Sequence, residues 1–221
     1  MVYTSLAKQM PASATPGTQW KDGFPFVANS LVLDFVNTRP VIGGTAQELL
    51  PDFNALLRWF GAVELLTARD VGALRRRWRN STRARRVLAE LREFREDLRR
   101  EVLSWEGGIS LHRSTIDRVN FLLAKHPMIA VVRQTEDGAR KELAFESHQP
   151  ENLFAPLALA AATLFTEVDR SRVRKCRQCV LHFVDTSKKG ARRWCSTQTC
   201  GNRLKVAAYA RRRRRARGGD D

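Results

Sequence analysis

The most regular amphipathic pattern lies in the middle of the chain. Between Ser81 and Trp105, apolar residues recur every three or four positions, which predicts one long helix with an apolar stripe. The stripe consists of Ala84, Val87, Leu88, Leu91, Phe94, Leu98, Val102 and Trp105. The opposite side mixes arginines with acidic residues, so we expect a solvated, salt-bridged face there and no nucleic-acid site.

In three other segments, the spacing of apolar residues predicts a helix or a strand. Apolar residues after Asp52 recur at helical spacing as far as Phe60, and Gly61 is expected to end that helix. In residues 128–147, β-branched residues precede a Glu-Asp-Gly turn, and apolar residues alternate with glutamates after it. This pattern predicts a β-hairpin. Residues 152–169 return to a helical pattern. Their apolar run of 13 residues is shorter than the roughly 20 that a membrane span needs, so we expect a core helix and no membrane partner.

The ends of the chain differ from this middle part. Residues 1–22 mix prolines with small polar residues, and we expect a flexible lead. They contain no apolar stretch typical of a secretory signal, which favours a cytoplasmic protein. Residues 23–169 are long enough to bury a core of their own. Within them, the apolar run from Leu31 to Asn37 fits either a strand or a short helix.

All four cysteines lie in the last quarter of the chain. Two residues lie between Cys176 and Cys179, and four lie between Cys195 and Cys200. The two pairs are separated by 15 residues, so the motif is C-x2-C-x15-C-x4-C. Two close pairs joined by a loop can place four thiolates around one Zn²⁺ ion at about 2.3 Å. The stretch after Cys200 is rich in helix formers, so we expect the second pair at a helix N-terminus. This spacing favours a treble-clef finger over residues 170–217 with one structural zinc ion.

Other uses of the cysteines fit less well. Disulfides are disfavoured without a secretory signal, and a redox dithiol normally follows an apolar strand, whereas basic residues surround Cys176. His182 is an alternative ligand, although four thiolates already complete the shell. Phe183 and Trp194 are expected to pack over the metal. The expected fold class is therefore α+β: a mostly helical N-terminal domain with a small hairpin, followed by the finger.

Positive charge is concentrated on the finger. The chain has 39 basic and 23 acidic residues, a net charge of +16. Residues 171–221 contain 16 of the basic residues and only 3 of the acidic ones, a net of +13, which leaves +3 for residues 1–170. Such asymmetry is typical of a phosphate-binding module. A solvated basic tail or adhesion to an anionic membrane is the alternative, but the tail has no apolar face.

Helical phase indicates which residues would face nucleic acid. If Cys200 faces the metal, Asn202, Lys205, Tyr209 and Arg212 share the opposite side of the helix. Asparagine and arginine can bind base edges, whereas lysine more often contacts phosphate. Arg203 either joins these contacts or braces the finger. The remaining expected backbone contacts are Lys188, Lys189, Arg192 and Arg193 in the loop, and Arg211, Arg212, Arg213, Arg214 and Arg215 in the tail.

The cysteine region also resembles a known family. Cys176-x2-Cys179, Phe183–Ser187, Arg192–Ser196 and Cys200-Gly-Asn-Arg203 resemble the CGNR zinc finger of bacterial stress-induced transcription regulators. Members carry an N-terminal ABATE domain, whose opening motif is similar to Leu31–Thr38. The resemblance implies a helix at that motif, a structural zinc and DNA binding. Val180-Leu181 and Thr197 depart from the family pattern, which concerns the packing of the knuckle and not its ligands.

These observations favour a two-domain DNA-binding regulator whose N-terminal domain senses an effector or forms a homodimer. The scattered histidines have no metal-ligand spacing, and no acid/base pair is recognisable, so we expect no enzyme. Asp34, Asn37 and Arg39 could line a small-molecule effector pocket, or could cap a helix before Pro40. The alternatives are an RNA-binding or ribosome-associated protein, and an enzyme with an N-terminal catalytic domain and a docking finger.

Overall fold

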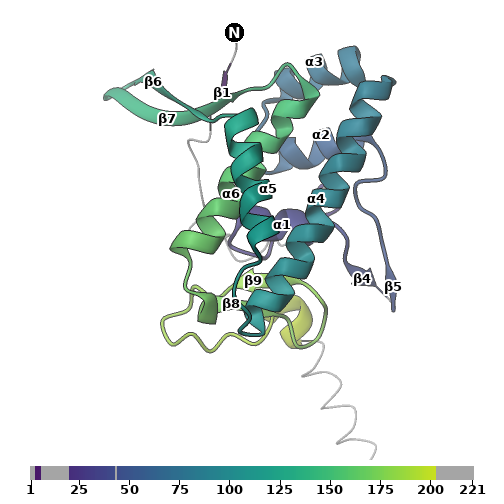
Figure 1. Cartoon of the computed structure of the whole chain (residues 1–221), viewed down its shortest axis with the longest axis vertical. Helices are drawn as coiled ribbons and strands as arrows, with labels where there is room; N and C mark the ends of the chain where they lie inside the picture. The colour runs from purple at the N-terminus through teal and green to yellow at the C-terminus, as the bar shows by residue number, and fades with distance from the viewer. Residues whose placement is uncertain (1–2, 6–19, 43, 203–221) are drawn as a thin grey trace, which may run out of the picture.

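The computed structural model describes residues 3–5, 20–42 and 44–202 (Figure 1). The α-helices are α1 (Leu31–Val36), α2 (Phe53–Ala62), α3 (Ala68–Trp78), α4 (Thr82–Glu106), α5 (Arg113–Lys125) and α6 (Phe154–Glu167). The strands are β1 (Tyr3–Ser5), β2 (Trp20–Lys21), β3 (Phe24–Pro25), β4 (Val41–Ile42), β5 (Thr45–Ala46), β6 (Ile129–Thr135), β7 (Gly138–Glu146), β8 (Val173–Lys175) and β9 (His182–Val184). The fold class is thus α+β, as predicted.

The strands form small antiparallel ladders instead of one large sheet. The largest has the order β1-β7-β6, and β2-β3, β4-β5 and β8-β9 are two-stranded. Short 3₁₀ turns span Pro150–Leu153 and Arg170–Arg172, and a π-helical turn spans Thr197–Gly201. The helices therefore supply most of the core.

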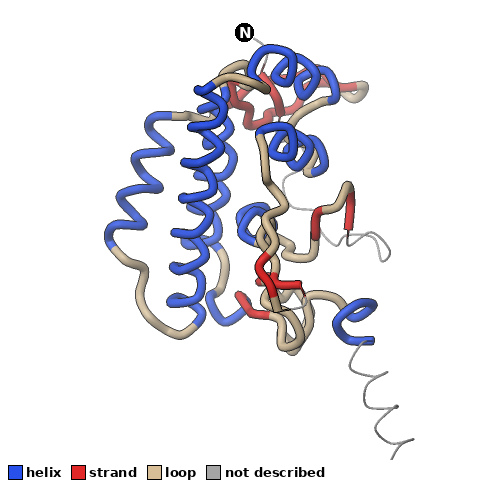
Figure 2. Tube along the Cα trace, turned by 90° about the vertical axis from the view of Figure 1, so that its right-hand side faces the viewer, coloured by secondary structure: helices blue, strands red, loops and turns tan. Residues whose placement is uncertain are grey.

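Three long helices, α4, α5 and α6, run side by side along the molecule (Figures 1 and 2). The short helix α1 packs against α4, α6 and strand β9, and five of its side chains are buried. Helices α2 and α3 pack on each other, and α2 also contacts α4. One apolar core connects these elements, and it includes Val173 and Val184 from the C-terminal region.

The long helix α4 confirms the amphipathic prediction. The Ser81 side chain accepts a hydrogen bond from the Ala84 N–H at 3.0 Å, which caps the helix. Every residue of the predicted stripe is buried. The expectation of a solvated opposite face is wrong in part, because Arg95 and Glu101 are also buried, at 1% and 4% exposure.

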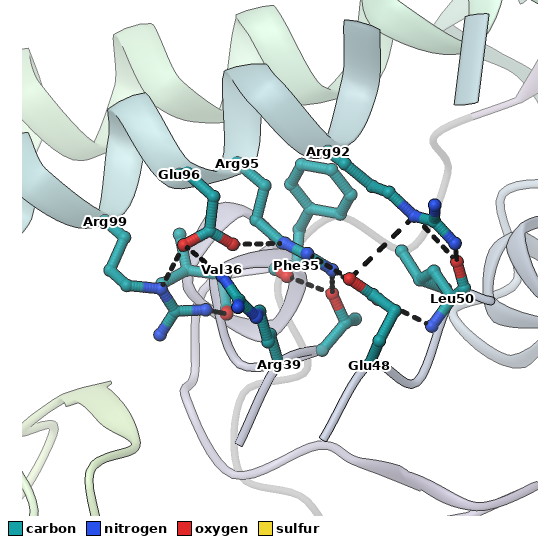
Figure 3. Close-up of polar contacts among 10 residues, drawn as sticks. Phe35, Val36, Arg39, Glu48, Leu50, Arg92, Arg95, Glu96 and Arg99 are labelled. Carbon is teal, nitrogen blue, oxygen red and sulfur yellow. Dashed lines mark hydrogen bonds and ion pairs between the residues drawn. The ribbon is translucent and has the colours of Figure 1, made fainter. Parts of the chain in front are cut away.

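Arg95 is buried because helix α4 lies against the segment that follows α1 (Figure 3). Its guanidinium donates to Thr38 Oγ1 at 3.0 Å and to both carboxylate oxygens of Glu48, at 2.8 and 2.5 Å. One turn later, Arg99 binds the Val36 carbonyl at the end of α1 and pairs with Glu96 at 3.1 Å. The charged side of α4 therefore fixes α1 in place.

The other predicted elements are present with small shifts at their ends. The run from Leu31 is a helix, α1. Helix α2 begins after Asp52, whose carboxylate accepts from the Ala55 N–H at 2.8 Å, and ends at Ala62, one residue beyond Gly61. Strands β6 and β7 form the predicted hairpin, and α6 lies within the helix predicted over residues 152–169.

Helices α3 and α5 were not among the elements predicted from the sequence. Leu74 is the buried residue of α3, and Val119 and Leu122 are those of α5. Apolar residues do recur at helical spacing, at Val71, Leu74 and Trp78 in α3 and at Ile116, Val119 and Leu123 in α5, but each stripe is short. Their stability comes from tertiary packing and, in α3, from a capping box between Thr67 and Asp70.

Part of the predicted lead, residues 1–22, is structured. Strand β1 pairs with β7, so that Thr4 lies opposite Phe145, and β2 pairs with β3. Residues 1–2 and 6–19 lie outside the described residues, as do Gly43 and residues 203–221. In the described part of the chain, no helix is both long and apolar enough to cross a bilayer.

Candidate metal centre

The first cysteine pair lies in the turn between β8 and β9. The two strands pair antiparallel, with Lys175 opposite His182, and the Cys176 N–H donates to the Leu181 carbonyl at 2.9 Å. The second pair lies at the π-helical turn Thr197–Gly201: Cys195 precedes this turn and Cys200 lies within it. The Gly201 N–H donates to the Ser196 carbonyl at 3.0 Å. A knuckle and a helical turn thus present the two pairs to each other, as the spacing predicted.

The four sulfur atoms converge on one point. Ligand atoms of Cys176, Cys179, Cys195 and Cys200 all lie within 4.8 Å of one another. The Sγ atom of Cys195 is 3.6 Å from those of Cys179 and Cys200, far longer than a disulfide bond of about 2 Å. Tetrahedral zinc with bonds of about 2.3 Å separates its sulfur ligands by about 3.8 Å. The residues therefore fit one zinc ion.

The thiols also need a cation if they are all to ionise. Hydrogen bonds, first from Cys179 and then from Cys195, lower the pKa of Cys176. The hydrogen bond to Cys176 raises the pKa of Cys179 to about 12, and the bonds to both neighbours raise that of Cys195. One thiolate is thus stabilised at the expense of the others, and a divalent cation is what removes this conflict.

Apolar side chains enclose the cluster. Phe183 is fully buried and Trp194 partly buried, and both pack with Val27, Leu181 and the cysteines. The expectation that Phe183 and Trp194 pack at the metal site is confirmed. His182 is not a member of the thiol cluster: its Nε2 atom lies 3.7 Å from the Glu106 carboxylate, in the domain contact described below.

Arg192 braces this cluster from one side. Its guanidinium lies over the Phe183 ring at 4.4 Å and donates to the carbonyls of Trp194, at 2.9 Å, and of Cys195. It also reaches the Val27 carbonyl at 3.2 Å. Arg192, expected above to contact nucleic acid, is therefore occupied within the finger. Local sequence could not reveal this, because Val27 lies 165 residues away.

The finger is joined to the N-terminal domain along strand β9. We call the following contacts the domain interface. The Val184 N–H donates to the Ala28 carbonyl at 2.7 Å, and the Asn29 side chain donates to the Val184 carbonyl at 3.1 Å. The Lys175 N–H donates to Glu106 at the end of α4, at 2.6 Å. Strand β9 therefore has partners in both domains.

Asn37 and His182 form the buried centre of the domain interface. Both are at most 1% exposed. The Asn37 amide donates to the His182 carbonyl and accepts from the His182 N–H, each at 2.9 Å. Burial, then the positive charges of Arg99 and Lys175, lower the pKa of the His182 imidazole to about 4. The ring is therefore neutral at physiological pH.

The three residues proposed for an effector pocket have separate roles. Asp34 accepts from the N–H groups of Val27 and Ala28, at 3.1 and 3.0 Å, and burial raises its pKa to about 7. Asn37 is used in the domain interface, and Arg39 is half exposed and pairs with Glu96 at 3.4 Å (Figure 3). Helix capping, the alternative, holds for Asn37, which is the C-cap residue of α1 and whose backbone N–H donates to the Leu33 carbonyl. The effector pocket stays a prediction.

A cavity of about 430 Å³ lies between α4 and α5, away from those residues. Its lining includes Leu98 and the buried acid Glu101. Glu101 accepts from the His112 N–H at 2.9 Å and from the Thr115 hydroxyl at 2.6 Å, and these bonds offset its burial so that its pKa is lowered. The Glu101 carboxylate already has hydrogen-bond partners within the protein, so the cavity gives no support to the prediction of an effector pocket.

Several predicted nucleic-acid contacts are accessible. Lys188, Lys189, Arg193 and Asn202 are exposed, and the structure gives the three basic side chains no ion-pair partner among the described residues. The remaining predicted contacts, Arg203, Lys205, Tyr209 and Arg211–Arg215, lie outside the described residues.

Comparison with known families agrees with this geometry. A model of the ABATE family, described as "putative stress-induced transcription regulator", matches residues 29–168, more than half of the 221 residues. A model of the CGNR zinc finger matches residues 172–213, which contain all four cysteines. Comparison with proteins of curated function finds no match. The chain belongs to the ABATE family and carries a CGNR zinc finger with four cysteines placed for one structural zinc ion.

Proposed function

We propose that the protein is a transcription regulator that binds duplex DNA through its zinc finger. The zinc is structural, because four thiolates close the coordination shell and leave no position for a substrate water. The observation that carries the proposal is a braced loop, Asp185–Arg192, which presents two exposed lysines, Lys188 and Lys189, that have no ion-pair partner within the described part of the chain.

The loop is held by hydrogen bonds at both ends. The buried Asp185 carboxylate accepts from the Ser187 N–H at 2.9 Å and from the Arg192 N–H at 2.8 Å. Arg172 donates to the Ser187 carbonyl at 2.6 Å, and Arg174 to the Gly190 carbonyl at 2.9 Å. These contacts reduce the entropy that the loop would lose on binding.

Gly190 shows how closely the loop is packed. Its φ angle of +57° lies in the left-handed region, and a Cβ atom there would sit 3.3 Å from the Arg172 guanidinium. Lys188 and Lys189 directly precede the turn at Gly190, so both lysine side chains extend from a backbone that is held by hydrogen bonds on either side. Lysines so placed suit phosphate oxygens, whose contact releases counterions.

The rest of the proposed surface comes from residues that follow the loop in the sequence. Arg193 is exposed next to the loop. Asn202 is exposed after the π-helical turn, where the sequence predicts a helix that carries Lys205, Tyr209 and Arg212. The arginines 211–215 would add affinity without sequence preference.

Binding of a labelled duplex DNA, measured by fluorescence anisotropy over a salt series, tests the proposal. The slope of log K against log salt is negative for duplex DNA, and each lost phosphate contact reduces its magnitude by about 0.9. We expect Lys188→Ala/Lys189→Ala to lower it by about 1 to 2. The matched control is Arg75→Ala/Arg76→Ala, which removes the same charge from exposed positions on α3, at the opposite end from β8 and β9 (Figure 1).

Equal losses in both double variants would show a response to net charge alone and contradict the proposal. Tighter binding of an RNA duplex or single strand at the same salt would favour the RNA-binding alternative instead. In both comparisons the zinc-loaded full chain is used, so that the finger is folded in every sample.

A further inference from the structure

We propose that the outer edge of strand β6 pairs with the same strand of a second copy of the chain. The sheet order β1-β7-β6 places β6 at the outside, with no further strand beside it among the described residues. The β6–β7 hairpin projects from the helical body at the end opposite the finger (Figures 1 and 2). The inference does not depend on DNA binding.

The register of the hairpin shows which backbone groups are unpaired. Thr135 lies opposite Gly138 across a two-residue turn, and such flanking residues form a hydrogen-bonded pair. Hydrogen-bonded pairs then alternate along the ladder, through Arg133 and Val131. The N–H and C=O groups of Ala130, Val132 and Gln134 therefore point away from β7, toward the free edge.

This edge lacks the features that usually protect an edge strand. Its pairing with β7 is continuous from Ile129 to Thr135, without a bulge, and it contains no proline or lysine. Its one charge, Arg133, pairs with Glu142 of β7 at 3.0 Å. At its centre, Val132 is 76% exposed, the highest value among the exposed large apolar residues. An apolar, unprotected edge indicates a binding surface.

A second copy fits this edge because the strand is self-complementary about Val132. A two-fold axis there places Val132 opposite itself and Ala130 opposite Gln134 of the second copy. All three outward positions then form hydrogen-bonded pairs, with about six backbone hydrogen bonds in total. Arg133 falls opposite Val131 of the second copy, so no like charges face each other.

The paired hairpins would form one continuous sheet across two molecules. Because the fingers lie at the far ends, both would remain accessible. The contact is a strand edge and not a broad face, which places it among the smaller interfaces of less than about 1,200 Å². We therefore expect a dimer that dissociates on dilution.

Sedimentation velocity of the zinc-loaded full chain over a range of concentrations tests this interface. We expect the average mass to rise toward that of a dimer. Val132→Lys places two like charges on the two-fold axis and should leave a monomer at every concentration. Ala139→Lys is the matched control: it adds the same charge to an exposed position of the same hairpin, on β7, and should behave as the parent.

A cross-link tests the register directly. Hydrogen-bonded antiparallel pairs have Cα atoms about 5.5 Å apart, within the range of a disulfide. Val132→Cys should therefore give a covalent dimer on mild oxidation, whereas Gln134→Cys, which faces Ala130, should not. A parent that is monomeric at all concentrations, or a dimer unaffected by Val132→Lys, would overturn the proposal. Equal cross-linking at both positions would overturn the register and with it the two-fold axis.

Discussion

The Asn37 side chain binds the backbone of His182 through both ends of its amide, 145 residues away in the sequence. The two hydrogen bonds reproduce the pairing of a β-ladder, so Asn37 serves as a side-chain partner for strand β9. An asparagine at the end of α1 thereby fixes the strand that follows the first cysteine pair. The finger and the N-terminal domain are packed together through this contact.

Removal of the Asn37 amide should loosen the finger and lower overall stability. Asn37→Ala leaves the buried N–H and C=O of His182 without partners, which costs about 2–4 kcal/mol. Urea unfolding of the zinc-loaded protein measures the change. Asn54→Ala, at an exposed position of α2, is the control and should change the free energy of unfolding by less than about 0.5 kcal/mol. Equal effects at the two positions would rule out the role assigned to Asn37.

Zinc removal should disturb more than the finger. The N–H groups of Val184 and Lys175 donate across the domain interface, and Arg192 reaches Val27. Hydrogen exchange after chelation should therefore show lost protection in residues 173–202, including the N–H groups of Lys175 and Val184 that donate to the N-terminal domain, while α2 and α3 stay protected. Protection should return with zinc but not with magnesium. Unchanged exchange at Lys175 and Val184 would mean that the domain interface does not depend on zinc.

The buried ion pair of Arg95 should matter far more than surface pairs on the same helix. Arg95→Met removes the guanidinium donor from Thr38 and Glu48, of which Glu48 keeps the Leu50 N–H and a longer pair with Arg92. Breaking a buried ion pair typically costs about 3–5 kcal/mol. Because Glu48 is 30% exposed, water offsets part of this, and we expect about 2–3 kcal/mol. Arg86→Met removes an exposed pair with Glu90 and should cost less than about 1 kcal/mol. Thermal unfolding of the two variants makes the comparison.

His182 should make the folded state sensitive to acid. Its pKa is lowered from 6.5 to about 4 in the folded protein, so below pH 6.5 the unfolded chain binds a proton that the folded chain does not. The contribution to stability is complete above pH 6.5 and is lost as the pH falls toward 4, by up to about 3 kcal/mol. His182→Gln should reduce this pH dependence of unfolding. With zinc in excess for both proteins, identical pH profiles would contradict the prediction.

Helices α4 and α5 differ in how well the sequence predicts them. The apolar stripe of α4 repeats over its whole length, so its bounds were predicted to within one residue. Helix α5 has apolar residues at helical spacing only at Ile116, Val119 and Leu123, and this shorter stripe was not recognised as a helix. The cysteines could be assigned as metal ligands because their spacing alone allows one tetrahedral site. By contrast, the residues next to Arg192 in the sequence give no sign of its contact with Val27.

The sequence by itself determined the metal ligands, the long helix, the hairpin and the concentration of charge on the finger. Each depends on residues close together in the chain, where spacing maps directly onto geometry. Only the tertiary structure decided that Asn37 binds His182, that Arg95 is buried and that β6 is an open edge. These depend on which surfaces meet after distant segments pack, and no local pattern encodes that choice.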